Sequence, residues 1–460
     1  MRDSAAMEPT LSRHAPSPPA LPVLGHLLSM RSEPLTWIPK VTREHGDVLR
    51  LTFPRRQGLL VNHPEGVRHV LQEHHRNYDK ATPGFEEIRK LLGNGLLTSE
   101  GDFWLRQRRI AQPAFTRQRL AGFAPTMVRA SEDLRERWLG ISPSRPTVDV
   151  ADAMMALTLR IAGETLLSTD PSASASEVGS ALAEILQQIR GRIATPLQFL
   201  ARLPTQKNKR YAEAAATLDR VVRRIIEERR RDPGADDGRD LLGMLMAARD
   251  DDGRGMSDEQ LRDEVLTIFL AGHETTANAL AWTFHLLSLH PTVRRALHDE
   301  VDAVIGDRAP TLDDLPQMPY ARRVIQESMR LRPPVWFIAR RAVRDDAIMG
   351  HAVEANSMVF ISPWSLHRHP GFWPDPEGFD PDRFLPESVA ARPTAAYIPF
   401  GAGPRICIGQ GFAMMEAQLI LASLCRSFTL ENLPGRRVEP EPTVTLRPRG
   451  GLPMTLVARR

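Results

Sequence analysis

The chain has 460 residues, of which 42% are hydrophobic and 25% are charged, so it can bury a large core as globular proteins do. Its 60 basic and 56 acidic residues leave a formal net charge of +4, too small at this length to indicate a nucleic-acid-binding protein. Only five of the basic residues are lysine, and this bias toward arginine is typical of a bacterial gene rich in G and C.

The two cysteines and the N-terminus bear on location. Cys407 and Cys425 are too few for a disulfide framework, which favours a reducing cytoplasm. Residues 1–28 hold no apolar run as long as a bilayer span or the hydrophobic part of a signal peptide. We therefore expect a disordered lead over residues 1–20, no membrane anchor, and a single domain over residues 21–460.

The first structural pattern along the chain is a β-hairpin at residues 46–62, where two short runs of Val, Leu and Phe flank residues 54–58. Arg55 and Arg56 lie at its turn, where we expect a solvated tip, with capture of a substrate carboxylate as the alternative. Residues 64–330 are mostly helical in pattern and include a helix that begins near residue 100 and ends near Pro113. Polar loops rich in Asp and Gly are expected at 232–239 and 250–256.

The longest predicted helix begins after Ser257, which forms a capping-box pattern with Gln260, and it ends at His290 and Pro291. About thirty residues at a rise of 1.5 Å give a rod roughly 45 Å long, enough to cross a whole domain.

Residues 271–276 (AGHETT) lie in the middle of this helix. Gly272 costs about 1 kcal/mol relative to Ala there, which calls for a packing or functional reason. A Thr275 hydroxyl bonded to the Ala271 carbonyl would loosen the turn and make room beside the helix. His273 and Glu274 begin the H-E-x-x-H pattern of zinc proteases, but residue 277 is Ala and the second histidine is missing. We expect His273 to be packed or to face the substrate.

Beyond Pro333 the pattern changes to short β-like runs at 343–362, Pro-rich loops at 363–404, one helix at 408–426 and a β-like tail. A helix-rich centre with β-rich flanks predicts an α+β fold that is mainly α.

Residues 400–409 (FGAGPRICIG) surround Cys407 with features that a buried core cysteine does not need. The glycines let the backbone turn tightly and approach something flat. Cys407 immediately precedes a predicted helix, so free N–H groups at 408–410 can point at its sulfur and stabilise the thiolate. Phe400 offers an apolar wall and Arg405 a cation. Cys425, in the middle of that helix, is expected to be a small buried residue.

Other interpretations of this loop fit less well. A dinucleotide-binding loop would need an acidic residue on a following strand, and a zinc site would need more Cys or His nearby. A nucleophilic cysteine does not explain the surrounding Gly and Phe. The loop matches the signature F-x-x-G-x-R-x-C-x-G at every fixed position, and in this the chain resembles the cytochrome P450 family.

The resemblance follows the family's order over essentially the whole chain. It implies the cytochrome P450 fold, a helix-rich domain with a smaller β-rich portion around a buried haem b. It also implies that Cys407 is the axial ligand of the iron, and that Phe400 and Gly409 belong to the haem-binding loop.

Glu327 and Arg330 lie one turn apart on a predicted helix, where such a pair is usually a solvated bridge worth a few tenths of a kcal/mol. The resemblance implies another role, because the family has a Glu-x-x-Arg motif in this region. Arg383, in residues 379–384 (FDPDRF), resembles the family's aromatic-x-Pro-x-Arg element. The implied Glu327–Arg330–Arg383 triad is buried and structural rather than catalytic.

Burying the two haem propionates requires donors of opposite charge. The resemblance implies them at Trp104 and Arg108 on one helical face, at Arg340, and at Arg405. Arg341 is adjacent to Arg340, so which of the two reaches a propionate stays open. The neighbouring arginines are expected to form a solvated basic face (Arg106, Arg109, Arg117 and Arg119).

Residues 271–275 match the family's [AG]-G-x-[DE]-T motif, which implies that Glu274 and Thr275 relay protons to bound dioxygen. The implied enzyme is a haem-thiolate monooxygenase that inserts one oxygen atom into a lipophilic small molecule such as a fatty acid, terpene or steroid. Substrate contacts are expected at 78–97, 270–275, 335–338 and 445–452, where Trp336 and Phe337 would narrow the pocket.

The chain has no motif for a flavin or nicotinamide domain. The resemblance therefore implies electrons from a separate ferredoxin or flavodoxin with its reductase, docking near the cysteine loop and residues 104–119. We expect a cytoplasmic monomer that binds neither nucleic acid nor membrane. The alternatives are a peroxygenase or isomerase of the same fold, and a haem-binding sensor or carrier without turnover.

Overall fold

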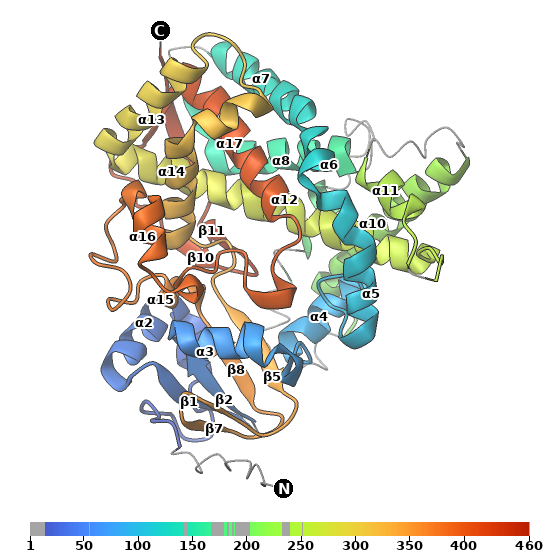
Figure 1. The fold of residues 1–460 in the computed structure, drawn as a ribbon, viewed down its shortest axis with the longest axis vertical. Helices are drawn as coiled ribbons and strands as arrows, with labels where there is room; N and C mark the ends of the chain where they lie inside the picture. The colour runs from blue at the N-terminus through green and yellow to red at the C-terminus, as the bar shows by residue number, and fades with distance from the viewer. Residues whose placement is uncertain are drawn as a thin grey trace, which may run out of the picture. The chain divides into compact units, whose positions relative to one another are not determined.

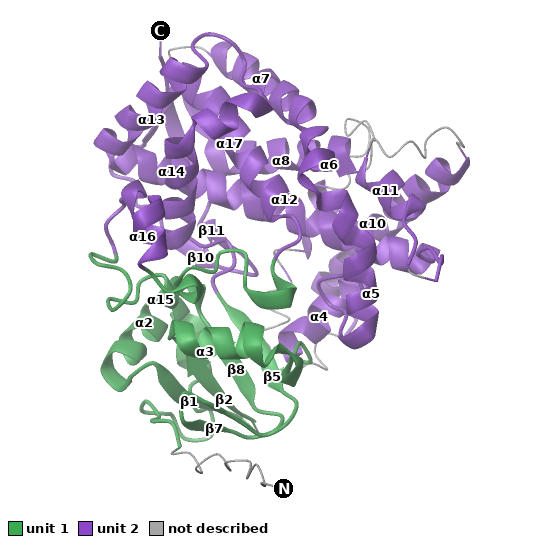
Figure 2. Ribbon diagram, viewed as in Figure 1, with its two compact units in different colours: residues 1–82, 337–376, 392–406 green, residues 83–336, 377–391, 407–460 purple. Residues whose placement is uncertain are grey.

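The structure is a computed structural model that describes residues 14–54, 56–141, 146–166, 179–181, 184–185, 188, 203–231, 240–250 and 252–459. The first part of the predicted lead, Arg55 at the hairpin turn and the predicted loop at 232–239 lie outside the described residues. The chain divides into two compact units (Figure 2). Unit 1 comprises residues 1–82, 337–376 and 392–406, and unit 2 comprises residues 83–336, 377–391 and 407–460. The single domain expected over 21–460 stays a prediction.

Unit 1 is built on a five-stranded sheet with the order β1-β2-β8-β5-β3 (Figure 1). These strands are β1 (Val48–Phe53), β2 (Arg56–Val61), β8 (Met358–Ile361), β5 (Ile338–Ala342) and β3 (Tyr78–Asp79). A separate two-stranded ribbon pairs β6 (Asp346–Ile348) with β7 (His351–Val353). The helical segments are α1 (Leu27–Ser32), α2 (Pro34–His45), α3 (Pro64–Arg68), the π-helical turn η1 (His69–Glu73), η2 (His75–Asn77), α15 (Pro363–Leu366), η7 (Thr394–Ala396) and η8 (Gly403–Arg405).

The predicted hairpin is confirmed, because β1 and β2 pair antiparallel with Val48 opposite Val61 and Phe53 opposite Arg56. Its inward side chains join a core that also contains side chains of α3 and η1. Residues 15–18, assigned to the disordered lead, pack against this unit: Ala15 is buried, and the Pro16 carbonyl accepts a hydrogen bond from the Arg50 N–H at 2.8 Å. Residues 15–18 are therefore an ordered part of unit 1, because the Pro16 carbonyl is bonded to the edge of β1.

Unit 2 is mainly helical. Its helices are α4 (Pro83–Leu92), α5 (Gly101–Ala111), η3 (Gln112–Phe115), α6 (Arg117–Ala121), α7 (Ala124–Leu139), α8 (Val150–Leu166), α10 (Gln206–Arg231), α11 (Leu241–Ala247), α12 (Asp258–Leu289), α13 (Pro291–Val304), η5 (Leu312–Gln317), α14 (Pro319–Leu331), η6 (Pro381–Phe384), α16 (Pro386–Ala390) and α17 (Gln410–Ser427). Two small antiparallel sheets complete it: β4 (Thr147–Asp149), β12 (Pro453–Ala458) and β9 (Phe428–Asn432) in one, β10 (Pro440–Pro442) and β11 (Leu446–Pro448) in the other.

Helix α12 is the central element of unit 2, and Figure 1 shows it passing among the other helices. It contacts α8, α10, α14 and α17. The predicted capping box is present, since the Ser257 hydroxyl accepts from the Gln260 N–H at 3.2 Å and the Gln260 side chain accepts from the Ser257 N–H at 2.9 Å. Residues 276–287 are buried on all sides, as expected of a helix that is apolar around most of its circumference.

In the part of the chain that the structure describes, no helix combines the length and apolar character needed to cross a bilayer.

Candidate active site

Cys407 belongs to unit 2 and lies directly before α17, whose N-cap is Gly409. The residue exposes surface, although protein atoms crowd round its sulfur. This crowding raises the pKa of the Cys407 thiol, while a hydrogen bond from the Gly409 N–H and the charge of Arg108 act to lower it. Cys407 is thus an exposed residue with a backbone donor and a cation near its sulfur. Cys425, by contrast, is 2% exposed inside α17, and burial raises the pKa of its thiol to about 12.

Helix α5 brings the predicted Trp104 and Arg108 onto one face, four residues apart. Trp104 is buried and Arg108 is half-buried. Burial lowers the pKa of the Arg108 guanidinium, and the charge of Cys407 opposes that shift, which places the two groups in one electrostatic environment.

The expected basic face is only partly present. Arg109, Arg117 and Arg119 are exposed. Arg106 is not simply solvated: its Nε donates to Asp250 at 2.7 Å, which fastens α5 to the loop after α11. The expectation of a solvated side chain is therefore wrong for Arg106, because it pairs with a carboxylate distant in sequence.

The middle of α12 is open on one side. Ala271 is exposed, and a Cβ built on Gly272 would meet nothing within 4 Å in the described part of the chain. The Thr275 hydroxyl donates to the Ala271 carbonyl at 2.7 Å, as the sequence predicts. Small side chains and a hydroxyl thus line an accessible patch on a helix that is otherwise mostly buried.

Glu274 points away from this patch. It is 5% exposed, and its Oε1 accepts from the Thr445 hydroxyl at 2.7 Å. Asn278 in turn donates to the Thr445 hydroxyl oxygen at 3.1 Å. Burial raises the pKa of Glu274, and the Thr445 hydrogen bond and the charge of Arg447 oppose the rise. Successive helical residues diverge by about 100°, so Glu274 and Thr275 serve different faces of α12.

His273 and Thr276, which flank Glu274 and Thr275, both make hydrogen bonds to other protein groups. His273 is buried, its Nδ1 lies 2.9 Å from the Phe269 carbonyl, and burial lowers its pKa, so it is packed rather than ligating. The Thr276 hydroxyl donates to the Gly272 carbonyl at 3.2 Å, and the same side chain hydrogen-bonds the buried Glu416 of α17. That contact lies on the side of α12 that faces α17.

The predicted triad is confirmed in its geometry. Glu327 and Arg330 of α14 are both 0% exposed, and Arg330 donates twice to the Glu327 carboxylate, at 2.7 and 2.8 Å. Arg383 Nε lies 3.4 Å from Glu327 Oε1. The Asp380 N–H also donates to Glu327, and Arg330 donates to the Gly378 carbonyl at 2.7 Å. These contacts fasten α14 to the segment that contains η6.

Unit 1 holds the other predicted haem-binding residues, Phe400, Arg405 and Arg340. Phe400 and Arg405 are half-buried in the loop that ends at η8. Gly403 in this loop has a φ of +66°, and a Cβ there would lie 2.0 Å from the Leu71 carbonyl oxygen, so only glycine fits. Arg341 donates to Asp79 at 2.5 Å, whereas Arg340 is buried on the opposite face of β5. Arg340 donates to the Ala339 carbonyl at 2.9 Å, so both arginines make contacts within unit 1.

Trp336 and Phe337, which are expected to contact substrate, also contact other residues of the protein. The Trp336 indole N–H donates to the Thr443 carbonyl at 2.9 Å, and Phe337 stacks on Phe360 with centroids 5.4 Å apart. Sequence reasoning missed Asn278 altogether. Its spacing of four residues from Glu274 on the same helix was the available signal.

Comparison with known proteins identifies the class. The family model described as Cytochrome P450 matches residues 15–452. The chain is 39% identical to cyclooctatin synthase of Streptomyces melanosporofaciens, with 94% of each chain covered. It is 37% identical to cyclooctat-9-en-7-ol 5-monooxygenase of the same organism, with 95% of each covered. A crystal structure titled cytochrome P450DA heme domain superposes with a TM-score of 0.89 and 30% identity, covering 98% of this chain and 99% of that one.

These matches extend over nearly the whole chain. The protein belongs to the cytochrome P450 family and is a haem-thiolate monooxygenase. The prediction of a mainly α cytochrome P450 fold is confirmed.

Proposed function

We propose that Cys407 binds the iron of a haem b and that the enzyme hydroxylates a cyclic terpene. The observation that carries the assignment of the ligand is that Cys407 is exposed, with the Gly409 N–H directed at its sulfur and Arg108 nearby. A thiolate held by a backbone donor and a cation is a suitable donor for haem iron, whereas Cys425 is sealed in a helix core.

The remaining predicted residues fit the other parts of a haem. By the family resemblance, the proposed donors for the two propionates are Trp104, Arg108, Arg340 and Arg405. Phe400 and Gly409 flank the ligand loop. When bound, the haem activates dioxygen with two electrons and two protons, so that one oxygen atom enters the substrate.

The chain's own part in that chemistry is the delivery of protons and the exclusion of water. The Thr275 hydroxyl lies on the accessible patch of α12, where it can hold a proton-donating water. Burial raises the pKa of Glu274, the Thr445 hydroxyl donates to its carboxylate, and Asn278 holds that hydroxyl. Since the two side chains diverge, a proton passing from Glu274 to Thr275 needs water between them.

Thr275→Val should uncouple the enzyme without stopping electron uptake. Valine keeps the side-chain volume and removes only the hydroxyl, so electrons are still consumed while proton delivery loses its direction. We expect NADPH consumption within about twofold of wild type, with most of it recovered as hydrogen peroxide instead of product. A positioned general acid or base contributes roughly 100- to 10,000-fold to the rate of a proton-transfer step, so the loss of product should be large. The measurement is peroxide released per NADPH consumed, with surrogate redox partners.

Thr283→Val is the matched control. The Thr283 hydroxyl makes the same kind of bond, to the Ala279 carbonyl at 2.7 Å, on the same helix but in a fully buried position. It should change stability and leave coupling unaltered. Equal coupling in wild type and Thr275→Val would remove Thr275 from the mechanism.

The substrate class rests on the relatives. Fatty acids, terpenes and steroids all suit an apolar pocket, and the names of the similar Streptomyces proteins, cyclooctatin synthase and cyclooctat-9-en-7-ol 5-monooxygenase, favour a cyclic terpene. Trp336 and Phe337, each held by the contacts described above, offer rigid aromatic walls suited to a ring system.

Cyclic terpene alkenes and alcohols should shift the haem Soret band of the purified protein, and linear fatty acids of equal carbon number should not. Turnover under ¹⁸O₂ with surrogate partners should give a terpene product that carries one ¹⁸O atom. A shift and turnover with fatty acids alone would overturn the terpene proposal. Binding of a terpene without any NADPH-dependent product would favour the sensor or carrier alternative.

The electron donor is proposed to be a separate ferredoxin or flavodoxin. Exposed Arg109, Arg117 and Arg119 lie in unit 2 with Cys407, and such a basic surface suits an acidic protein partner. A cytoplasmic monomer remains our proposal for location and assembly, and the scarcity of cysteine supports the location.

A further inference from the structure

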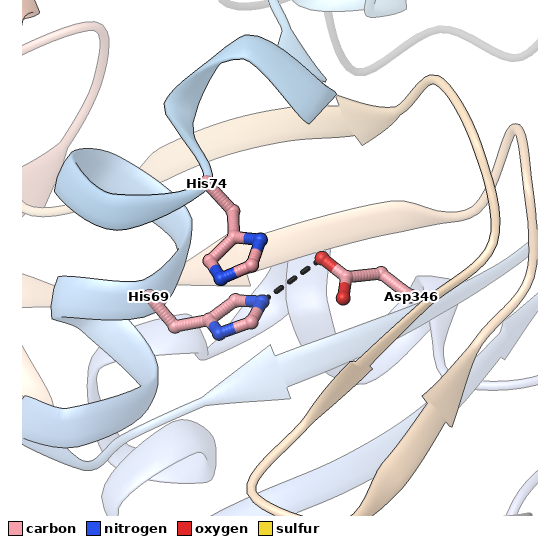
Figure 3. A group of neighbouring side chains, drawn as sticks. All are labelled: His69, His74 and Asp346. Atoms are coloured by element: carbon pink, nitrogen blue, oxygen red, sulfur yellow. Dashed lines mark hydrogen bonds and ion pairs between the residues drawn. The ribbon is translucent and has the colours of Figure 1, made fainter. Parts of the chain in front are cut away.

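Unit 1 contains a group of metal-binding side chains that the monooxygenase reaction does not use. His69, His74 and Asp346 each offer one donor atom, and these atoms all lie within 4.8 Å of one another. His69 Nε2 is 2.9 Å from Asp346 Oδ2, and the two imidazole rings are stacked with centroids 4.0 Å apart at 11°. Figure 3 shows the His74 ring over the His69 ring, with a nitrogen of each toward the carboxylate.

The backbone of η1 creates this stacking. Residues five apart on an α-helix point about 140° away from each other, so His69 and His74 would diverge there. The segment instead closes a π-helical turn, in which the His74 N–H donates to the His69 carbonyl at 2.8 Å. The wider turn places residues i and i+5 one above the other, and such turns occur frequently at functional sites.

Asp346 is held in place by residues around it. The Tyr78 hydroxyl donates to Asp346 Oδ2 at 2.7 Å, and the Ala347 N–H donates to Oδ1 at 2.8 Å. The Asn77 side-chain amide donates to Asp346 Oδ2 at 3.4 Å and to the Arg344 carbonyl. These bonds fix the start of β6. Burial opposes ionisation of Asp346, but the hydrogen bonds from Tyr78 and His69 outweigh it and hold its pKa below the usual range.

We propose that His69, His74 and Asp346 bind a divalent transition-metal ion of the zinc type. Two imidazoles and a carboxylate are donors that Zn²⁺ accepts, and a water would complete the tetrahedron. Metal bonds of about 2.0–2.1 Å place tetrahedral donors roughly 3.3 Å apart, so the exposed His74 ring needs to move by no more than roughly 1.5 Å. Tyr78 is a positioning residue that orients the carboxylate.

The ion would join η1 to β6. On its other side, η1 supports the loop before Cys407, because the Leu71 carbonyl lies where a side chain on Gly403 would be. Bound metal would therefore stabilise the turn on which this loop rests, and its role would be structural rather than catalytic.

Zn²⁺ titration of the full-length holoprotein by calorimetry, after removal of metals with a chelator, tests the proposal. Wild type should bind one Zn²⁺ and gain thermal stability with Zn²⁺. His74→Ala should weaken binding by more than tenfold, and it should fold because His74 is exposed. Tyr78→Phe, which keeps the ring and loses the donor to Asp346, should weaken binding by roughly tenfold to a hundredfold.

His75→Ala is the matched control, since His75 is adjacent in sequence but its Nδ1 lies 2.9 Å from the Gln72 carbonyl, in a local contact. It should bind Zn²⁺ as wild type does. The proposal is overturned if wild type binds no Zn²⁺, or if His74→Ala and His75→Ala weaken binding equally, which would indicate unspecific binding by surface histidines.

Discussion

Glu327→Ala should yield little folded holoprotein. The substitution leaves Arg330, which is 0% exposed, without its carboxylate partner and removes the acceptor of the Asp380 N–H. Arg383, 11% exposed, loses the same partner. Burial raises the pKa of Glu327 and the Arg330 hydrogen bond opposes that rise, so the carboxylate and the guanidinium depend on each other. Removing one partner of a buried ion pair costs about 3–5 kcal/mol, a large part of the stability of most domains.

The measurement is the free energy of unfolding in urea, together with the ratio of haem to protein after purification. Glu227→Ala is the control: Glu227 pairs with Arg231 at 3.7 Å on the surface of α10, with side chains 65% and 78% exposed. Loss of that pair should cost less than about 1 kcal/mol. A Glu327→Ala protein with full haem content and wild-type stability, lacking turnover alone, would show that the triad is catalytic rather than structural.

Local chemistry made much of the fold predictable. The ends of α12 follow from Ser257, Gln260 and Pro291, because capping and the missing proline N–H act within one turn. The β1–β2 hairpin follows from its apolar runs. The Glu327–Arg330–Arg383 triad could be predicted only from the family resemblance, because Arg383 lies more than fifty residues from Glu327 and no local rule connects them.

The parts that sequence could not supply depend on distant partners. Arg341 pairs with Asp79 and Arg106 pairs with Asp250, and neither partner is close in sequence, so these contacts could not be predicted locally. The direction of Glu274 toward Thr445, 171 residues away, has the same origin. The π-helical turn at His69 is a backbone irregularity that helical periodicity reads as an ordinary helix.

We propose Cys407 as the haem ligand, and Cys407→Ser should therefore have the largest effect on the cofactor. A serine hydroxyl is a harder donor than a thiolate and does not ionise near neutral pH, so it cannot supply thiolate ligation to the iron. In Cys407→Ser, the Gly409 N–H and the charge of Arg108 would have no thiolate to stabilise. Cys425→Ala is the control, because it removes the other thiol from a fully packed position.

The spectrum of the dithionite-reduced protein under carbon monoxide tests this claim most directly. Wild type and Cys425→Ala should both show the red-shifted Soret band of thiolate ligation, and Cys407→Ser should lack it. A red-shifted band that persists in Cys407→Ser would contradict the account, because the iron would then have a different thiolate ligand.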